Sequence, residues 1–126
     1  MAADRDRILE TIQSYVDLVG SGTADAILAL YADGATVEDP VGSEVRTSRE
    51  SIHEFYAAIE PLEQESALVS ARIAEDRSSA AFQFELVTKV GDQRYTLAPI
   101  DVMTFDDEGR ITSMRAFWSN EDMQVS

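Results

Sequence analysis

The chain of 126 residues contains no cysteine and only one histidine. Without cysteine it can form neither a disulfide bond nor a thiolate metal site, and it has no cysteine nucleophile. It also has no apolar run near the roughly 18 residues that a bilayer crossing requires. We therefore expect a soluble protein with a single domain, residues 1–126, large enough for one core and one small-ligand cavity.

Basic residues are also scarce, because 24 acidic side chains stand against 10 basic ones and give a net charge of −14. A field of this sign repels phosphate backbones and anionic membrane surfaces. The sequence thus predicts no nucleic-acid partner and no membrane partner, and it disfavours polyanionic substrates. The plainer interpretation is that the charge keeps the protein soluble. Neutral apolar ligands remain open.

Sequence motifs for export, cofactors and metals are missing as well. Charged residues 4–7 stand where a secretory signal would have its apolar stretch, so we expect a cytoplasmic protein. There is no phosphate-binding glycine loop and no dinucleotide fingerprint, so no cofactor is predicted. The acidic segment 106–109 is typical of a hairpin turn and lacks the later ligands of a calcium loop. His53, beside the apolar stripe of a predicted helix, is expected at the surface, and no metal site is predicted.

Helical periodicity dominates the first half of the chain. Apolar residues at helical spacing predict a helix that starts near Ile8 and ends at the glycines of 20–22. Thr23 can cap a short second helix that extends to Ala32. The segment 47–50 has capping-box spacing and predicts a third helix that ends before Pro61.

The second half of the chain alternates with a period of two. This pattern predicts four strands after the third helix, and one further strand is predicted before that helix. The predicted strands cover residues 35–39, 68–74, 80–90, 94–105 and 110–118. Helices followed by hairpin-linked strands indicate an α+β fold, with the helices covering one face of a curved antiparallel sheet to form a cone. The expected apolar lining, for which ordinary core packing is the alternative, comprises Phe82, Phe84, Leu86, Met114 and Trp118.

Two acidic residues lie in phase with apolar neighbours on predicted strands. Asp39 shares its phase with Val37, and Asp101 shares its phase with Met103. Ionised carboxylates are almost never fully buried unless they are paired. Each position therefore indicates either a local hydrogen-bonding solution or tuned acid–base chemistry.

Structural alternatives exist for every candidate. Asp39 precedes Pro40, where aspartate favours a turn. Asp101 could accept a buried backbone hydrogen bond, or an error in the register could point it outward. Tyr15, Tyr31 and Tyr56 lie on inward-turned faces of predicted helices and could be ordinary core tyrosines with satisfied hydroxyls.

Three segments resemble the ketosteroid isomerases of the nuclear-transport-factor-2-like (NTF2-like) superfamily, in their bacterial Δ5-3-ketosteroid form. They are residues 31–42, 100–111 and 116–119, and the resemblance extends over nearly the whole chain. The most specific feature is the combination of Tyr15, Asp39 before a proline, and Asp101 before Val-Met. The resemblance implies a cofactor-free isomerisation that turns a β,γ-unsaturated 3-ketosteroid into its α,β-unsaturated isomer.

The resemblance also assigns roles to residues. Asp39 would remove the proton at C4 and return it at C6, acting first as base and then as acid. Tyr15 and a protonated Asp101 would donate hydrogen bonds to the enolate oxygen that develops at C3. Tyr31 and Tyr56 would form a hydrogen-bonded chain that supports donation by Tyr15.

The expected ligand is a small apolar steroid, and the resemblance implies a homodimer formed through the outer sheet face. Ile100, Val102 and Phe117 are apolar on the matching strand phase. The substrate-binding residues are expected to be Phe82, Phe84, Leu86, Pro99, Met114 and Trp118. Pro99 and the acidic segment 59–66 depart from the family pattern and bear on substrate choice. Two alternatives stay open: an isomerase for another polycyclic ketone, and a noncatalytic module that binds apolar ligands.

Overall fold

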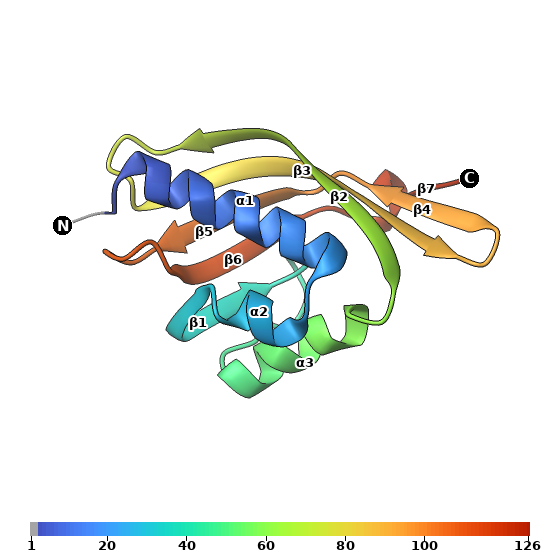
Figure 1. Cartoon of the computed structure of the whole chain (residues 1–126), viewed down its shortest axis with the longest axis horizontal. Helices are drawn as coiled ribbons and strands as arrows, with labels where there is room; N and C mark the ends of the chain where they lie inside the picture. Colours follow the sequence, from blue (N-terminus) through green and yellow to red (C-terminus); the bar gives the residue numbers. More distant parts are fainter. Residues whose placement is uncertain (1–2) are drawn as a thin grey trace.

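The protein, seen here in a computed structural model that describes residues 3–126, places three helices against a curved sheet of seven strands (Figure 1). The helices are α1 (Arg5–Ser21), α2 (Ala24–Leu28) and α3 (Arg49–Ile59). The strands are β1 (Tyr31–Glu38), β2 (Glu63–Ile73), β3 (Ser79–Val90), β4 (Gln93–Leu97), β5 (Ile100–Phe105), β6 (Ile111–Phe117) and β7 (Gln124–Val125). A 3-10 turn, η1 (Asn120–Asp122), precedes β7. The predicted α+β cone is confirmed.

Helix α1 begins where the side chain of Asp4 accepts the backbone N–H of Arg7 at 2.8 Å. Its apolar face packs against β2 and buries Ile8, Ile12, Tyr15, Val16 and Val19. At Gly20 the helix approaches β2 so closely that any Cβ would collide with Ser66. The helix therefore lies across the long strands, as Figure 1 shows, and holds Tyr15 toward the interior.

The second helix is shorter than predicted, because α2 ends at Leu28 and β1 already begins at Tyr31. The extension of this helix through Ala32 was therefore wrong. Pairing of β1 with β6, which begins with Tyr31 opposite Ile111, overrides the local helical preference. Tyr31 thus reaches the core from a strand.

Helix α3 begins one residue later than the predicted capping box implied. Ser48 is the N-cap, and its side chain accepts the N–H of Ser51, whose hydroxyl accepts the N–H of Ser48 in return. Thr47 and Glu50 do not form the box, because the Ser48–Ser51 pair satisfies the same geometry. The helix ends at Ile59, before Pro61, as expected.

The strands follow the order β1-β6-β5-β3-β4-β7, with β2 on the other side of β3. β1 is parallel to β6, so the sheet is mixed and the expectation of a purely antiparallel sheet was wrong. β1 enters the sheet from a helix and not through a hairpin, which leaves its direction free. The predicted strand 94–105 is split into β4 and β5 at Ala98 and Pro99, where proline lacks the N–H for pairing.

The core fills the space between the helices and the concave face of the sheet. Buried side chains from α1, α3, β1, β3, β5 and β6 form one continuous cluster. The opposite face of β5 and β6 exposes apolar side chains, including Ile100 at 47% and Phe117 at 43%. Within residues 3–126, no helix has the length and apolar character that a membrane crossing requires.

Candidate active site

A cavity of about 270 Å³ opens between α1, α3 and the concave side of the sheet. The three candidate catalytic residues, Tyr15, Asp39 and Asp101, all line it, although they come from α1, the end of β1 and β5. Most of the remaining lining is apolar: Val19, Phe55, Ile59, Leu62, Phe84, Leu86, Leu97, Pro99, Trp118 and Met123. A few polar groups thus line an otherwise apolar space, as in small-ligand sites.

Asp101 is held in the interior by its strand. It is 1% exposed and lies directly opposite Phe82 in the β3–β5 pairing, so alternation turns both side chains inward. Among the described residues, its Oδ1 has no hydrogen-bond partner. Burial, with a smaller contribution from the charge of Asp39, raises the pKa of Asp101 well above its usual range. Burial thus favours the protonated form of this carboxyl group, a form that can donate a hydrogen bond into the cavity.

Tyr15 belongs to a chain of three buried hydroxyls. Its oxygen lies 3.1 Å from that of Tyr56, which lies 2.6 Å from that of Tyr31. Burial is the main reason that the pKa of Tyr15 is raised well above its usual range, and the neighbouring Tyr31 adds to it. All three rings are nearly inaccessible to solvent. The hydroxyls therefore keep their protons, and the chain can hold one O–H pointed into the cavity.

Asp39 follows β1 directly and is hydrogen-bonded to the single tryptophan of the chain, Trp118. The indole N–H of Trp118 donates to Oδ1 of Asp39 at 2.7 Å. Burial raises the pKa of Asp39, and the hydrogen bond from Trp118 opposes that shift. Asp39 therefore lines the cavity as a partly desolvated carboxyl group with one oxygen held in place.

The arrangement combines two proton donors with one carboxylate base around an apolar space. A carboxylate can remove a proton beside a ketone only when the developing enolate oxygen is stabilised by fixed donors. In this cavity the Tyr15 hydroxyl and a protonated Asp101 are groups able to donate in this way, and the Asp39 carboxylate is a group able to accept a proton. The geometry is therefore suited to proton transfer at carbon next to a carbonyl group.

Not every predicted ligand contact lines the cavity. Phe84, Leu86, Pro99 and Trp118 do. Phe82 and Met114 are fully buried in the core and are absent from the lining, so their assignment to the pocket wall is corrected. Tyr15 and Phe84 occupy the space in front of Phe82, with ring centroids 6.1 and 6.0 Å away.

Sequence reasoning missed part of the wall. Thr88 lies on the same strand face as Phe84 and Leu86, so alternation along β3 could have identified it. Gln64 escaped because β2 begins at Glu63, before the predicted strand. Met123 reaches the cavity through the unpredicted pairing of β7 with β4.

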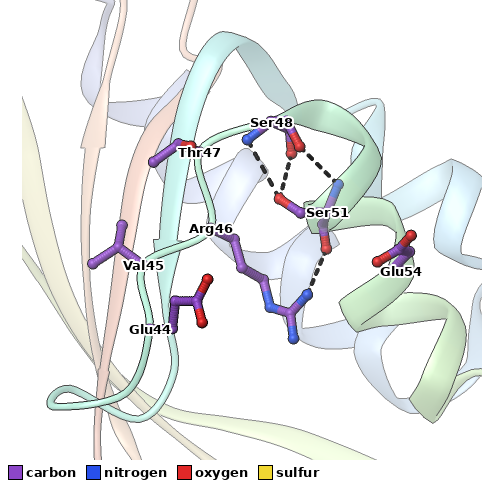
Figure 2. A pocket seen from close by; sticks show the side chains of 7 residues that line it. All are labelled: Glu44, Val45, Arg46, Thr47, Ser48, Ser51 and Glu54. Carbon is purple, nitrogen blue, oxygen red and sulfur yellow. Dashed lines mark hydrogen bonds between the residues drawn. The ribbon is translucent and has the colours of Figure 1, made fainter.

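A wider hollow of about 410 Å³ lies at the start of α3 (Figure 2). Its polar groups already fix the chain, because the guanidinium of Arg46 donates to the carbonyl of Ser51 and lies 5.2 Å from the Phe55 ring centroid. None of the candidate catalytic residues reaches it.

His53 lies on the outside of the molecule, where its ring is hydrogen-bonded to the carboxylate of Asp25. Among residues 3–126, no group of three histidine or acidic side chains is placed to hold a metal ion.

Residues 12–114 match the SnoaL-like domain family. The chain is also 47% identical over 115 residues to a steroid Delta-isomerase from Nocardioides simplex, an alignment that covers 91% of this chain and 92% of that protein. This chain belongs to the SnoaL-like family, among the steroid Delta-isomerases. The NTF2-like recognition and the isomerase class that the sequence predicted are confirmed.

Three solved structures share the fold of this chain. The epoxide hydrolase/cyclase-like enzyme SalBIII, described for pyran ring formation in salinomycin, has a TM-score of 0.89 at 29% identity, with 98% of each chain covered. The structure of Rv0760c from Mycobacterium tuberculosis has a TM-score of 0.87 at 20% identity, and the match covers 98% of this chain and 99% of that chain. A Delta 5-3-ketosteroid isomerase from Mycobacterium sp. has a TM-score of 0.84 at 23% identity, and the match covers 95% of this chain and 98% of that chain. The last two identities establish likeness of fold alone.

Proposed function

We propose that this protein is a steroid Δ5-3-ketoisomerase, which converts a β,γ-unsaturated 3-ketosteroid into the conjugated α,β-unsaturated isomer. The observation that carries the proposal is the fully buried Asp101, whose Oδ1 has no hydrogen-bond partner within residues 3–126, in the same cavity as Tyr15 and Asp39. A protonated acid without an internal partner is costly to bury, and a ligand oxygen at this place would satisfy it. The relative from Nocardioides simplex supports the reaction class.

The proposed reaction is an intramolecular proton transfer. The carboxylate of Asp39 removes a proton from C4, and the electrons of that C–H bond form a dienolate whose negative charge lies on the C3 oxygen. Tyr15 and Asp101 donate hydrogen bonds to this oxygen and lower the barrier. The dienolate then takes the same proton back from Asp39 at C6, which moves the double bond into conjugation and restores the carboxylate.

The other residues would serve the same reaction. Trp118 fixes one oxygen of Asp39, which leaves the second free to move between C4 and C6. Tyr56 and Tyr31 hold the Tyr15 hydroxyl in place. The apolar cavity wall, which includes Phe84 and Pro99, would contact the steroid ring system and keep water from the dienolate.

We also propose that the protein acts as a homodimer in the cytoplasm, joined through the outer face of β5 and β6. Ile100 and Phe117 are direct partners in the β5–β6 register and both are exposed. Val102 lies on the same face, two residues along β5. An exposed apolar row of this kind is a common interface feature.

The test is the ultraviolet absorbance of the conjugated enone after a Δ5-3-ketosteroid is mixed with the purified protein. We expect rapid formation of the enone, and a loss of at least about 10²–10⁴ in rate for Asp39→Asn, which keeps the shape but removes the base. Asp92→Asn, in the turn between β3 and β4, is the matched control and should retain full activity.

Two results would count against the proposal. Wild-type protein that binds phenolic steroids without forming the enone would favour a noncatalytic apolar-ligand-binding module. Turnover of other polycyclic ketones, with none of a Δ5-3-ketosteroid, would move the assignment to a different substrate.

A further inference from the structure

The cavity carries a second polar group at a distance from the candidate catalytic residues. Gln64, from β2, and Thr88, from β3, both line it and lie directly opposite one another in the strand register. The amide nitrogen of Gln64 lies 2.9 Å from the hydroxyl of Thr88, to which it donates. No step of the proposed reaction uses either side chain.

The strand register places this pair at the other end of the cavity. Along the inner face of β3, Phe82 lies opposite Asp101, Leu86 lies opposite Leu97, and Thr88 comes last. At the usual rise per residue, the path along the strand from Phe82 to Thr88 is at most ~20 Å. The region between them is apolar. The cavity wall is therefore polar at the catalytic end, apolar in the middle and polar again at the Gln64 end.

Exposure shows which end is open. Asp101, Tyr15 and Tyr56 are at most 2% exposed, whereas Leu62, which lines the cavity two residues before Gln64, is 41% exposed. Gln64 and Thr88 are partly buried. The pair therefore lies near the cavity mouth, shielded enough for a hydrogen bond to a ligand to differ from one to water.

The pair has hydrogen-bonding capacity beyond its mutual bond. The amide of Gln64 uses one N–H toward Thr88 and keeps a second N–H and its carbonyl oxygen. The Thr88 oxygen accepts that bond, and its own hydrogen is still available as a donor. If the amide were turned the other way, its carbonyl would accept from Thr88, and both amide hydrogens would be free. In each case the pair can both donate and accept.

We infer that Gln64 and Thr88 form a binding site for an oxygen substituent at the end of the steroid remote from the reacting ketone, on the five-membered ring at C17. The inference rests on the proposed function and deepens it, because it names the subclass of substrate: 3-ketosteroids with a hydroxyl or keto group at C17. An apolar tail at this position would leave the remaining donors and acceptors of the two side chains unsatisfied and would be disfavoured.

A simpler role for the pair is a cross-strand contact that stabilises β2 and β3. The two roles differ in what they do to ligand selectivity. A structural contact affects the binding of all steroids alike, whereas a subsite affects only those with the remote oxygen. Selectivity between matched ligands is therefore the quantity to measure.

The experiment uses two phenolic steroids, estradiol and its 17-deoxy analogue, because the phenol imitates the dienolate oxygen and no turnover occurs. Dissociation constants are measured for the wild type, for Thr88→Val and for Gln64→Met, each of which removes polar atoms with little change in size. Thr96→Val is the control, because Thr96 lies on β4 outside the cavity and opposite Val87. Circular dichroism checks that each variant is folded.

We expect the wild type and Thr96→Val to bind estradiol roughly three- to tenfold more tightly than the deoxy analogue. This ratio should fall toward one in Thr88→Val and in Gln64→Met. A ratio near one in the wild type, or an unchanged ratio in both cavity variants, would overturn the inference. If one variant failed to fold, the other would decide.

An enone assay on C17-oxygenated and C17-deoxy Δ5-3-ketosteroids separates this inference from the proposed function. Turnover of both with equal kcat/KM, together with equal binding, would overturn the C17 site and leave the isomerase intact. Absence of turnover and of steroid binding would overturn the isomerase and, with it, the inference.

Discussion

Trp118 and Asp39 are 79 positions apart in the chain, yet the indole N–H donates to the carboxylate at 2.7 Å. The bond joins the end of β6 to the end of β1, two strands that run in parallel. It fixes one carboxylate oxygen, and it favours the ionised form against the burial that raises the pKa of Asp39. It therefore links the position of the proposed base to its charge.

The first prediction concerns Trp118→Phe. Removal of the donor leaves burial unopposed, so the pKa of Asp39 rises further and the base is protonated over a wider acidic range. We expect the acid limb of the pH–rate profile to move to higher pH, and kcat to fall by on the order of tenfold. A profile of kcat/KM against pH is the measurement. A fall in rate without any movement of the acid limb would mean that Trp118 only shapes the cavity.

The second prediction separates the proposed donor Tyr15 from Tyr56, whose hydroxyl supports it. Tyr15→Phe removes a group that points at the ligand, and we expect a loss of on the order of 10²–10³ in kcat. Tyr56→Phe leaves the Tyr15 hydroxyl in place but removes its partner at 3.1 Å, and the expected loss is roughly three- to tenfold. Steady-state kinetics of both variants, with Tyr95→Phe on β4 as control, will test this order. Equal losses would contradict it.

How far the sequence predicts the site depends on which physical signal each residue carries. Asp39 and Asp101 could be identified because strand alternation reports which face a side chain occupies, and an acid on an apolar face is conspicuous. Gln64 carries no such signal, since a polar residue in an acidic segment is typical of the surface. Phe82 satisfied the same alternation as Phe84, but periodicity cannot tell a cavity wall from the core behind it.

The fold shows the same division. Local spacing predicted the helices, because the burial of one face repeats every three to four residues. The parallel pairing of β1 with β6 and the pairing of β7 with β4 are contacts between distant segments, which no local pattern reports. Pro99 marked the break between β4 and β5 in advance, but the prediction continued one strand through it and expected a change only in the pocket wall or the strand edge.

The third prediction follows from the raised pKa of Asp101. The folded protein holds a proton on this group at pH values where the unfolded chain has lost it. The stabilising contribution is therefore complete below the ordinary aspartate pKa of about 3.9, and it is lost as pH rises from there through the raised pKa of the folded state. Asp101→Asn cannot titrate and should lose less stability over this pH range than the wild type.

Urea unfolding at a series of pH values measures this difference. Asp107→Asn, in the turn before β6, provides a control with the same loss of charge at an exposed position. If the free energy of unfolding of Asp101→Asn and of the wild type changed in parallel with pH, Asp101 would not be the neutral acid that the proposed reaction needs.

The fourth prediction concerns the outer sheet face. Ile100 and Phe117 lie opposite one another on β5 and β6, and Arg115, paired with Glu38, lies 5.4 Å from the Phe117 ring centroid. Burial of this row between two copies would remove apolar surface from water, whereas a carboxylate placed there would meet its own copy across a two-fold axis. We expect Ile100→Glu to shift the protein from dimer to monomer in sedimentation velocity. Val90→Glu, at the exposed end of β3, should stay dimeric, because Val90 lies outside this row.

A wild type that sediments as a monomer at micromolar concentration would contradict the proposed interface. A monomeric Ile100→Glu that still forms the enone at the wild-type rate would show that each subunit holds a complete site.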